Sequence, residues 1–244
     1  MCVLLLAYHA HPDYDLIVAA NRDEFYDRPT AHAQFWRETP TLLAGRDLNA
    51  GGTWLGVNAA GHFAAVTNLR GGIAPSNRFS RGHLVRDFLN HPHTTHEYLS
   101  KISPLAANYA GCNLLIEDTQ TLHWWSQAGT RELVAGVYGM SNTELDHEWP
   151  KVSRLKSAFA GFTTLGGDPL ETALMAMLRD ADSAEEENKL LPDLRLDETI
   201  FVRSAGYGTR CSTVVLRHRE GMLRFVERSF DREGNPTGDN RFTL

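Results

Sequence analysis

Residues 2–25 read CVLLLAYHAHPDYDLIVAANRDEF, and this stretch decides the fold. Its first apolar run, Val3 to Tyr8, suits a buried strand and is far too short to cross a membrane. A second run, Asp15 to Ala20, follows a turn rich in His, Pro and Asp. Because short turns join antiparallel strands, we expect a hairpin over these two runs. Cys2 then stands at the beginning of a core strand.

A polar cluster, Asn21-Arg22-Asp23-Glu24, directly follows the second apolar run. We expect the strand to end at Ala20. In a hairpin the end of the second strand lies beside the beginning of the first, so the cluster should be within reach of Cys2. An arginine stabilises a nearby thiolate, and carboxylates orient the arginine or an amine. The alternative interpretation is an ion pair in a surface loop.

The rest of the chain alternates between hairpins and helices. Further strands are expected at residues 53–57, 62–67, 112–116, 121–126, 212–217 and 223–228, with a possible strand at 136–140. Helices are expected around residues 81–90, 94–102, 152–160 and 169–179. Hairpins with short turns favour antiparallel sheets, and amphipathic helices cover sheet faces. The order therefore predicts an α+β fold with two stacked antiparallel sheets between helical layers.

The composition is that of an ordinary folded protein. Of the 244 residues, 42% are hydrophobic and 22% are charged, and we find no glycine-rich linker and no repeat. We expect one domain over residues 1–244. The formal charge is -6 and the basic residues are scattered, which argues against nucleic acid as a partner. The acidic run Asp180 to Glu187 is expected to be solvated.

The cysteines and histidines indicate where the protein is located and whether it binds a metal ion. The chain has three cysteines, at positions 2, 112 and 211, which is an odd number without metal-ligand spacing. Neither a disulfide framework nor a signal peptide is indicated, so we expect a reducing cytoplasmic location. We expect Cys211 to be a buried strand cysteine. The histidines His91, His93 and His96 lack a carboxylate at ligand spacing, which disfavours a metal site.

Cys2 carries the candidate chemistry. It follows the initiator Met1, and its small side chain permits removal of the methionine. Removal would place a free α-amine on the same residue as the thiol. An α-amine has a pKa of about 7.7–8.0 and can take a thiol proton at neutral pH without a histidine. The alternative interpretation is a small buried hydrophobic residue at a strand end.

Six short motifs lie along the chain: Met1-Cys2, Asn21-Arg22-Asp23-Glu24, Gly52-Thr53-Trp54-Leu55-Gly56, Thr67-Asn68-Leu69-Arg70, Ser141-Asn142 and Gly208-Thr209-Arg210. Together they resemble the NRDE family, which is related to the Transport and Golgi organisation protein two. That family is in turn similar to the choloylglycine hydrolases and penicillin V acylases. The latter are cysteine amidases with an N-terminal nucleophile, and the resemblance implies their four-layer αββα sandwich.

The resemblance also implies roles for six residues. The nucleophile would be Cys2, tuned by the pair Arg22 and Asp23. The other three would be Asn68 as oxyanion donor, Asn142 near the free amine, and Arg210 as a cation for the substrate or transition state. From the residues alone, the two asparagines would be turn or capping residues and the arginine would lie at the surface, just before a strand.

Two functions remain open. As an enzyme, the chain would hydrolyse a small amide or thioester by acyl transfer to Cys2, and it would require no cofactor. As a binding protein, it would keep the fold without catalysis, and the family resemblance implies haem trafficking. Haem would need a wide apolar groove, to which Trp54, Trp124, Trp125 or histidine residues could contribute, and the sequence indicates no unique axial ligand. Either function implies a small-molecule partner and no membrane span.

Overall fold

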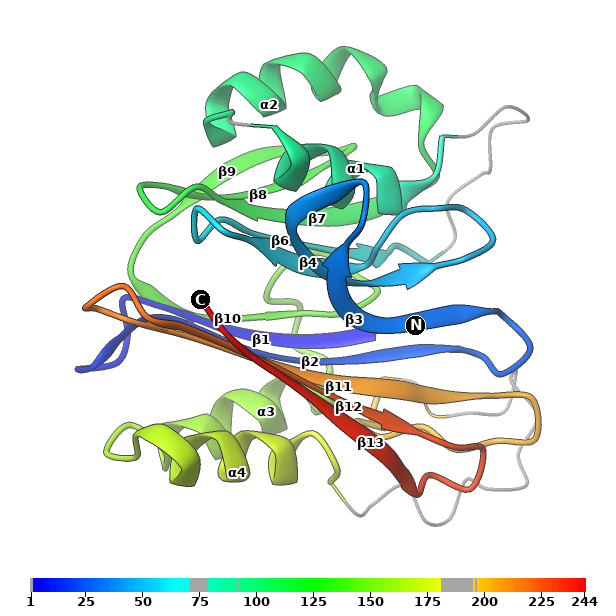
Figure 1. Ribbon diagram of the computed structural model, residues 1–244, viewed down its shortest axis with the longest axis vertical. Helices are drawn as coiled ribbons and strands as arrows, with labels where there is room; N and C mark the ends of the chain where they lie inside the picture. The colour runs from blue at the N-terminus through cyan, green and yellow to red at the C-terminus, as the bar shows by residue number, and fades with distance from the viewer. Residues whose placement is uncertain (1, 71–78, 92, 181–194, 196) are drawn as a thin grey trace. The chain divides into compact units, whose positions relative to one another are not determined.

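The computed structural model describes residues 2–70, 79–91, 93–180, 195 and 197–244. Within these residues the strands form two sheets, and every ladder between neighbouring strands is antiparallel. The contacts group the chain into two compact units (Figure 1). The first comprises Met1–Arg28, Ala135–Ser141 and Asp146–Leu244, and the second comprises Pro29–Val134 and Asn142–Leu145. The predicted α+β class with two antiparallel sheets is confirmed, and the single domain stays a prediction.

The sheet of the first unit runs in the order β10-β1-β2-β11-β12-β13. Its strands are β1 (Cys2–Tyr8), β2 (Tyr14–Phe25), β10 (Gly136–Met140), β11 (Tyr207–His218), β12 (Leu223–Phe230) and β13 (Pro236–Thr243). The predicted hairpin is present, because β1 pairs with β2 and Leu6 lies opposite Val18. β1 lies between β10 and β2, so it is an interior strand one place from the sheet edge. Cys2 opens this strand as predicted.

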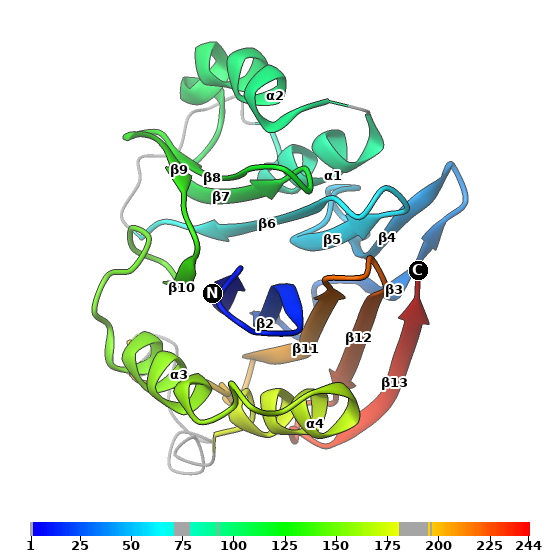
Figure 2. The same cartoon turned by 90° about the vertical axis from the view of Figure 1, so that its left-hand side faces the viewer.

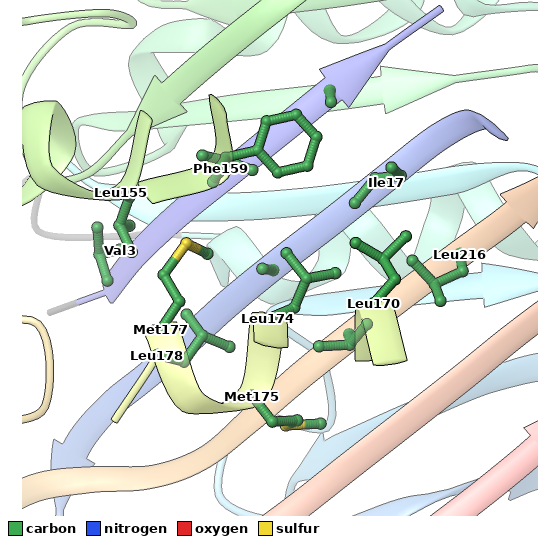
Figure 3. Packing of buried hydrophobic residues seen from close by; sticks show 14 of the residues in the cluster. Val3, Ile17, Leu155, Phe159, Leu170, Leu174, Met175, Met177, Leu178 and Leu216 are labelled. Atoms are coloured by element: carbon green, nitrogen blue, oxygen red, sulfur yellow. The ribbon is translucent and has the colours of Figure 1, made fainter. Parts of the chain in front are cut away.

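Two helices, α3 (Pro150–Ala160) and α4 (Gly167–Met177), cover one face of this sheet (Figures 1 and 2). Alternate residues of the strands point to them and form the core of the unit, which Figure 3 shows from close by. Members of this core include Val3, Leu5, Ile17, Leu155, Phe159, Leu170, Leu174, Val214 and Leu216. Burial of each large apolar side chain contributes about 1.5–3 kcal/mol.

β2 does not end at Ala20, as the sequence pattern predicts, but continues to Phe25. The polar cluster therefore lies inside the strand, where all four residues pair with β11 and the first two, Asn21 and Arg22, also pair with β1. Asn21 shows why this is tolerated: its Nδ2 donates to the carbonyl oxygens of Leu178 and Ile200, both at 2.8 Å. Its Oδ1 accepts from Ser212 Oγ at 2.6 Å. A buried polar side chain with its hydrogen bonds satisfied does not terminate a strand.

The sheet of the second unit runs in the order β3-β4-β5-β6-β7-β8-β9. Its strands are β3 (Thr30–Trp36), β4 (Thr39–Asp47), β5 (Leu55–Asn58), β6 (Phe63–Asn68), β7 (Cys112–Glu117), β8 (Leu122–Ser126) and β9 (Gly129–Leu133). The helices α1 (Arg81–Asn90) and α2 (Thr95–Ile102) and the 3₁₀ helix η1 (Ser103–Asn108) accompany it. α1 packs on the sheet through Leu84, Val85, Phe88 and Leu89.

Four strands were not predicted: β3, β4, β9 and β13. Three of them lie at sheet edges, where most side chains are exposed and the hydrophobic pattern is weak. Residues 181–187 of the acidic run lie outside the described residues. Among the residues that are described, no helix is long and apolar enough to cross a membrane.

Gly139 tests the packing of α3 on β10. A Cβ atom at this position would lie 2.2 Å from Val152 Cγ1, closer than van der Waals contact allows. We expect Gly139→Ala to lower the free energy of unfolding by about 1–3 kcal/mol, as measured by urea denaturation. Val152→Ala removes the clashing methyl group. The free energy of unfolding that the double variant loses should therefore be smaller than the sum of the losses in the two single variants.

The matched control is Gly238→Ala on β13, where an added Cβ would meet no atom within 4 Å. It should change stability by no more than about 0.5 kcal/mol. Strictly additive losses in the Gly139 and Val152 variants would show that the two residues are not in contact.

Candidate functional site

Cys2 lies directly opposite Arg22 of β2, and Arg22 lies opposite Cys211 of β11. Residues opposed across antiparallel strands point to the same face, so these three side chains form one row. Val3 points to the helices, and the row therefore lies on the other face of the sheet. Arg22 is only 5% exposed, which places a buried guanidinium between two thiols. Cys2 thus lies beside the polar cluster, as the hairpin predicts.

The surroundings of Cys2 hold its thiol in the protonated form. Burial raises the pKa of the thiol above its ordinary value, and the nearby Asp23 carboxylate raises it as well. The charge of Arg22 and a hydrogen bond from the Asp23 backbone lower the pKa, but less than burial raises it. Because the thiolate is the nucleophilic form, activation of Cys2 requires a base beside the sulfur.

The other two thiols are more deeply buried than Cys2, which is partly exposed. Burial raises the pKa of Cys112 to about 11. Burial and the neighbouring Glu227 raise the pKa of Cys211 well above its ordinary value. Cys211 is a buried strand residue, as predicted. Cys2 is therefore the most accessible of the three cysteines.

Asp23 follows Arg22 in the strand and so points to the opposite, helix-covered face. Its Oδ1 accepts from Thr209 Oγ1 at 2.7 Å, and Thr209 Oγ1 itself accepts from the Val202 backbone N–H at 2.9 Å. Burial raises the pKa of Asp23, whereas the charges of Lys151 and Arg22 and the hydrogen bond from Thr209 lower it. The predicted pair thus divides between two faces, and only Arg22 shares the face of the nucleophilic thiol.

The sequence pattern predicts that Arg210 lies at the surface just before a strand. In the structure it lies inside β11 instead. The strand begins earlier than predicted, at Tyr207, because it pairs with the extended part of β2. Arg210 occupies the irregular position of this ladder, and its Nη1 donates to the carbonyl oxygens of Phe25 at 2.9 Å and Arg28 at 3.2 Å. Burial and the charge of Arg22 lower the pKa of Arg210.

Asn68 and Asn142 belong to the second unit, whereas the other four predicted site residues belong to the first. Asn68 ends β6 with an exposed side chain. Asn142 is buried, and its Nδ2 donates to the Asn68 carbonyl oxygen at 2.8 Å. Asn142 also accepts from the Arg70 backbone N–H at 3.0 Å through its own carbonyl. The two asparagines are therefore held together, and their roles towards Cys2 stay predictions.

Ser141 was overlooked among the candidate residues, although it stands in one of the sequence motifs. Its Oγ donates to the Cys2 carbonyl oxygen at 2.8 Å, which fixes the backbone of the candidate nucleophile. The position of Ser141 directly after β10 could have indicated this, because β10 is the other neighbour of β1.

The three histidines considered as metal ligands lie in the second unit. The rings of His91 and His93 are 5.6 Å apart and line a cavity of about 470 Å³. His96 packs instead on His123, with ring centroids 4.9 Å apart. In the part of the chain that the structure describes, no group of three or more His, Cys, Asp or Glu side chains is arranged to hold a metal ion.

The structural class of the chain is an α+β fold of two antiparallel sheets, in which Cys2 opens an interior strand. The chain is similar in fold to a *Caenorhabditis elegans* N-acylethanolamine-hydrolyzing acid amidase (NAAA) ortholog, with a TM-score of 0.52 and 15% identity. The match covers 88% of this chain and 92% of that chain.

The family follows from sequence. Residues 1–232 match the family "Transport and Golgi organisation 2" (TANGO2), and the chain belongs to that family. It is 34% identical over 258 residues to a *Bos taurus* Transport and Golgi organization protein 2 homolog, covering 94% of this chain and 93% of the relative. The *Homo sapiens* homolog is 33% identical with the same coverage. The predicted family resemblance is confirmed.

The electrostatics of the site predict how Asp23 affects stability. Because its pKa is raised in the folded protein, the folded state holds the Asp23 proton more tightly than the unfolded chain does. The carboxyl group is neutral in both states below about pH 3.9, and folding is disfavoured as the pH rises from there through the higher folded pKa. Because Asn does not ionise, the stability that Asp23→Asn loses relative to the wild type should become smaller as the pH rises from about 3.9 through the folded pKa.

Asp118→Asn is the comparison variant, because the pKa of Asp118 is shifted in the opposite direction to that of Asp23. Burial raises the pKa of Asp118, but hydrogen bonds from Thr95, Thr121 and Gln120 outweigh it and leave the pKa lowered. This residue therefore stabilises the fold above about pH 3.9, and its contribution is lost in more acidic solution. Measured by denaturation against pH, the stability difference from the wild type should shrink for Asp23→Asn as the pH rises above about 3.9 and grow for Asp118→Asn as the pH rises towards about 3.9. Parallel trends would contradict this account.

Proposed function

We propose that the chain is a cysteine hydrolase of the N-terminal-nucleophile type, acting on a small amide or thioester. The observation that carries the proposal is the position of Cys2 at the beginning of β1, opposite the buried Arg22. Removal of Met1 would leave the thiol and the α-amine on this one residue. The hydrogen bond from Ser141 Oγ to the Cys2 carbonyl oxygen would then hold the new terminus in place.

In the proposed reaction the α-amine takes the thiol proton, and Cys2 Sγ attacks the acyl carbon of the substrate. The C–N or C–S bond of the substrate breaks, the leaving group takes the proton from the ammonium, and the acyl group remains on sulfur as a thioester. Water then gives a proton to the α-amine and attacks the thioester carbon. The bond between carbon and Sγ breaks, and the sulfur regains that proton.

Arg22 has a defined part in this scheme. Its guanidinium shares the face of the Cys2 thiol, and its positive charge lowers the pKa of that thiol. The charge would stabilise the thiolate that the α-amine generates. Glu24 limits this effect, because its carboxylate lies 3.8 Å from Arg22 Nη2.

Alkylation by iodoacetamide tests the proposal without knowledge of the substrate. Protein that begins at Cys2 should react at Cys2 faster than at Cys112 or Cys211, and faster than protein that retains Met1. Peptide mass spectrometry measures the rate at each thiol. Arg22→Ala should slow the reaction at Cys2 about tenfold for each unit by which it raises the thiol pKa, because only the thiolate reacts.

Arg86→Ala is the matched control, since Arg86 lies on α1 in the second unit and pairs with Asp87 at 2.7 Å. It should leave the reaction at Cys2 unchanged. Equal labelling of protein with and without Met1 would refute an activating role of the terminal amine.

Haem binding, the alternative function on the same fold, makes a separate prediction. Titration of haem into the pure protein would then produce a Soret shift that survives Cys2→Ala, because binding in an apolar groove needs no nucleophile. A shift that is lost in Cys2→Ala would indicate thiolate ligation instead. An unchanged spectrum at micromolar haem would remove this alternative.

A further inference from the structure

Lys151 is fully buried in the first unit, which is unusual for a lysine. It lies in the first turn of α3, and the other buried residues of this helix include Leu155 and Phe159. Residues spaced by four lie on one face of a helix. Leu155 and Phe159 pack in the core between α3 and the sheet (Figure 3). Lys151 therefore extends the sheet-facing stripe of α3 with a charged side chain.

This stripe reaches the end of the sheet at which Cys2 lies. Figure 3 shows Leu155 beside Val3, the residue that follows Cys2, and both belong to the same core cluster. Lys151 precedes Leu155 by about one helical turn. The opposite partner of Val3 on β2 is Asn21, two residues before Asp23 on the same face. Lys151 and Asp23 thus both lie on the helix-covered face, near this end of the sheet.

A single segment, residues 197–202, connects the two. The Lys151 backbone N–H donates to the Asp197 carbonyl oxygen at 3.1 Å. At the other end of the segment, the Val202 backbone N–H donates to Thr209 Oγ1, which in turn donates to Asp23 Oδ1. The start of α3 and the Asp23 carboxylate are therefore tied to one short piece of chain.

The charges of the two residues complement each other. A buried lysine is costly without an opposite charge, and so is a buried carboxylate. Burial raises the pKa of Asp23, and the Lys151 charge is one of several effects that offset part of this rise. The Trp149 ring, 5.4 Å from Lys151 Nζ, offers a further favourable contact. Glu171, another buried carboxylate of the unit, is bound by Arg224 at 3.2 Å and by Arg241.

We propose that Lys151 is a positioning residue of the Cys2 site, the buried counter-charge that holds the Asp23 carboxyl group in place behind the nucleophile. It acts through Asp23, whose backbone forms a hydrogen bond with the Cys2 thiol. The catalytic consequence rests on the proposed function, whereas the pairing of Lys151 with Asp23 does not. Loss of the Lys151 charge would release the Asp23 side chain and disturb the thiol on the other face of β2.

A double-mutant cycle tests the pairing by urea denaturation of the full chain. Lys151→Met and Asp23→Asn should each lower the denaturation midpoint, because each leaves one buried group without its partner. The double variant carries no buried charge at either position, and its midpoint should lie above that of at least one single variant. Lys156→Met, on the same helix, is the control, since Lys156 pairs with Asp146 at 3.1 Å near the surface. It should show no coupling to Asp23→Asn.

The ionisation of Asp23 gives a second readout that a purely structural role would not move. The carboxyl ¹³C signal of Asp23, assigned by its absence in Asp23→Asn, should report a carboxylate at neutral pH in the wild type. In Lys151→Met it should move towards the protonated form. Additive midpoints together with an unchanged carboxyl signal would overturn the role of Lys151. If Lys151→Met and Asp23→Asn are coupled but Cys2 proves unreactive, the hydrolase proposal is refuted and the pairing of Lys151 with Asp23 still holds.

Discussion

The register between β1 and β2 is the constraint on which the rest of the site depends. It is fixed by burial, since Val3, Leu5 and Ile17 must face the core under α3 and α4. A shift of one residue would turn every side chain of the strand to the other face. Because the apolar residues hold this register, Cys2 and Arg22 are brought side by side on the opposite face. The position of the candidate nucleophile is thus a consequence of packing on the other side of the sheet.

The same alternation explains why four consecutive polar residues can lie in the middle of a sheet. Asn21 and Asp23 point to the helix-covered face, where hydrogen bonds satisfy Asn21, and where a hydrogen bond and the charge of Lys151 offset part of the burial of Asp23. Arg22 points to the face of the thiol, beside a carboxylate of Glu24. Buried polar groups are tolerated only when they are satisfied in this way. The motif therefore contributes to both faces of the sheet. Asn21 and Asp23 lie on the face that packs against the helices, and Arg22 lies on the face of the candidate nucleophile.

Much of this fold is predictable from the sequence, because apolar runs and helical periodicity mark the hairpins and the helices. The proximity of Cys2 to Arg22 follows from the first hairpin alone. The continuation of β2 beyond Ala20 does not, since its polar residues are satisfied by groups far away in the chain. For the same reason the division of Arg22 and Asp23 between two faces was missed. Lys151 stands on an apolar helical stripe, a detectable signal, but its partner can be found only in the structure.

The central claim is the proposed role of Cys2 as an N-terminal nucleophile, in a chain of the Transport and Golgi organisation 2 family whose fold is similar to that of an acid amidase. Arg22, Ser141 and the backbone of Asp23 lie beside this residue, and none of these three groups is a base that could take the thiol proton. In the proposed scheme the base is the α-amine of Cys2 itself, which becomes free only after Met1 is removed. Intact-mass spectrometry of the protein purified from its native host tests this directly. The account predicts a mass lower than that of the full chain by one methionine residue, and a population that wholly retains Met1 would contradict it.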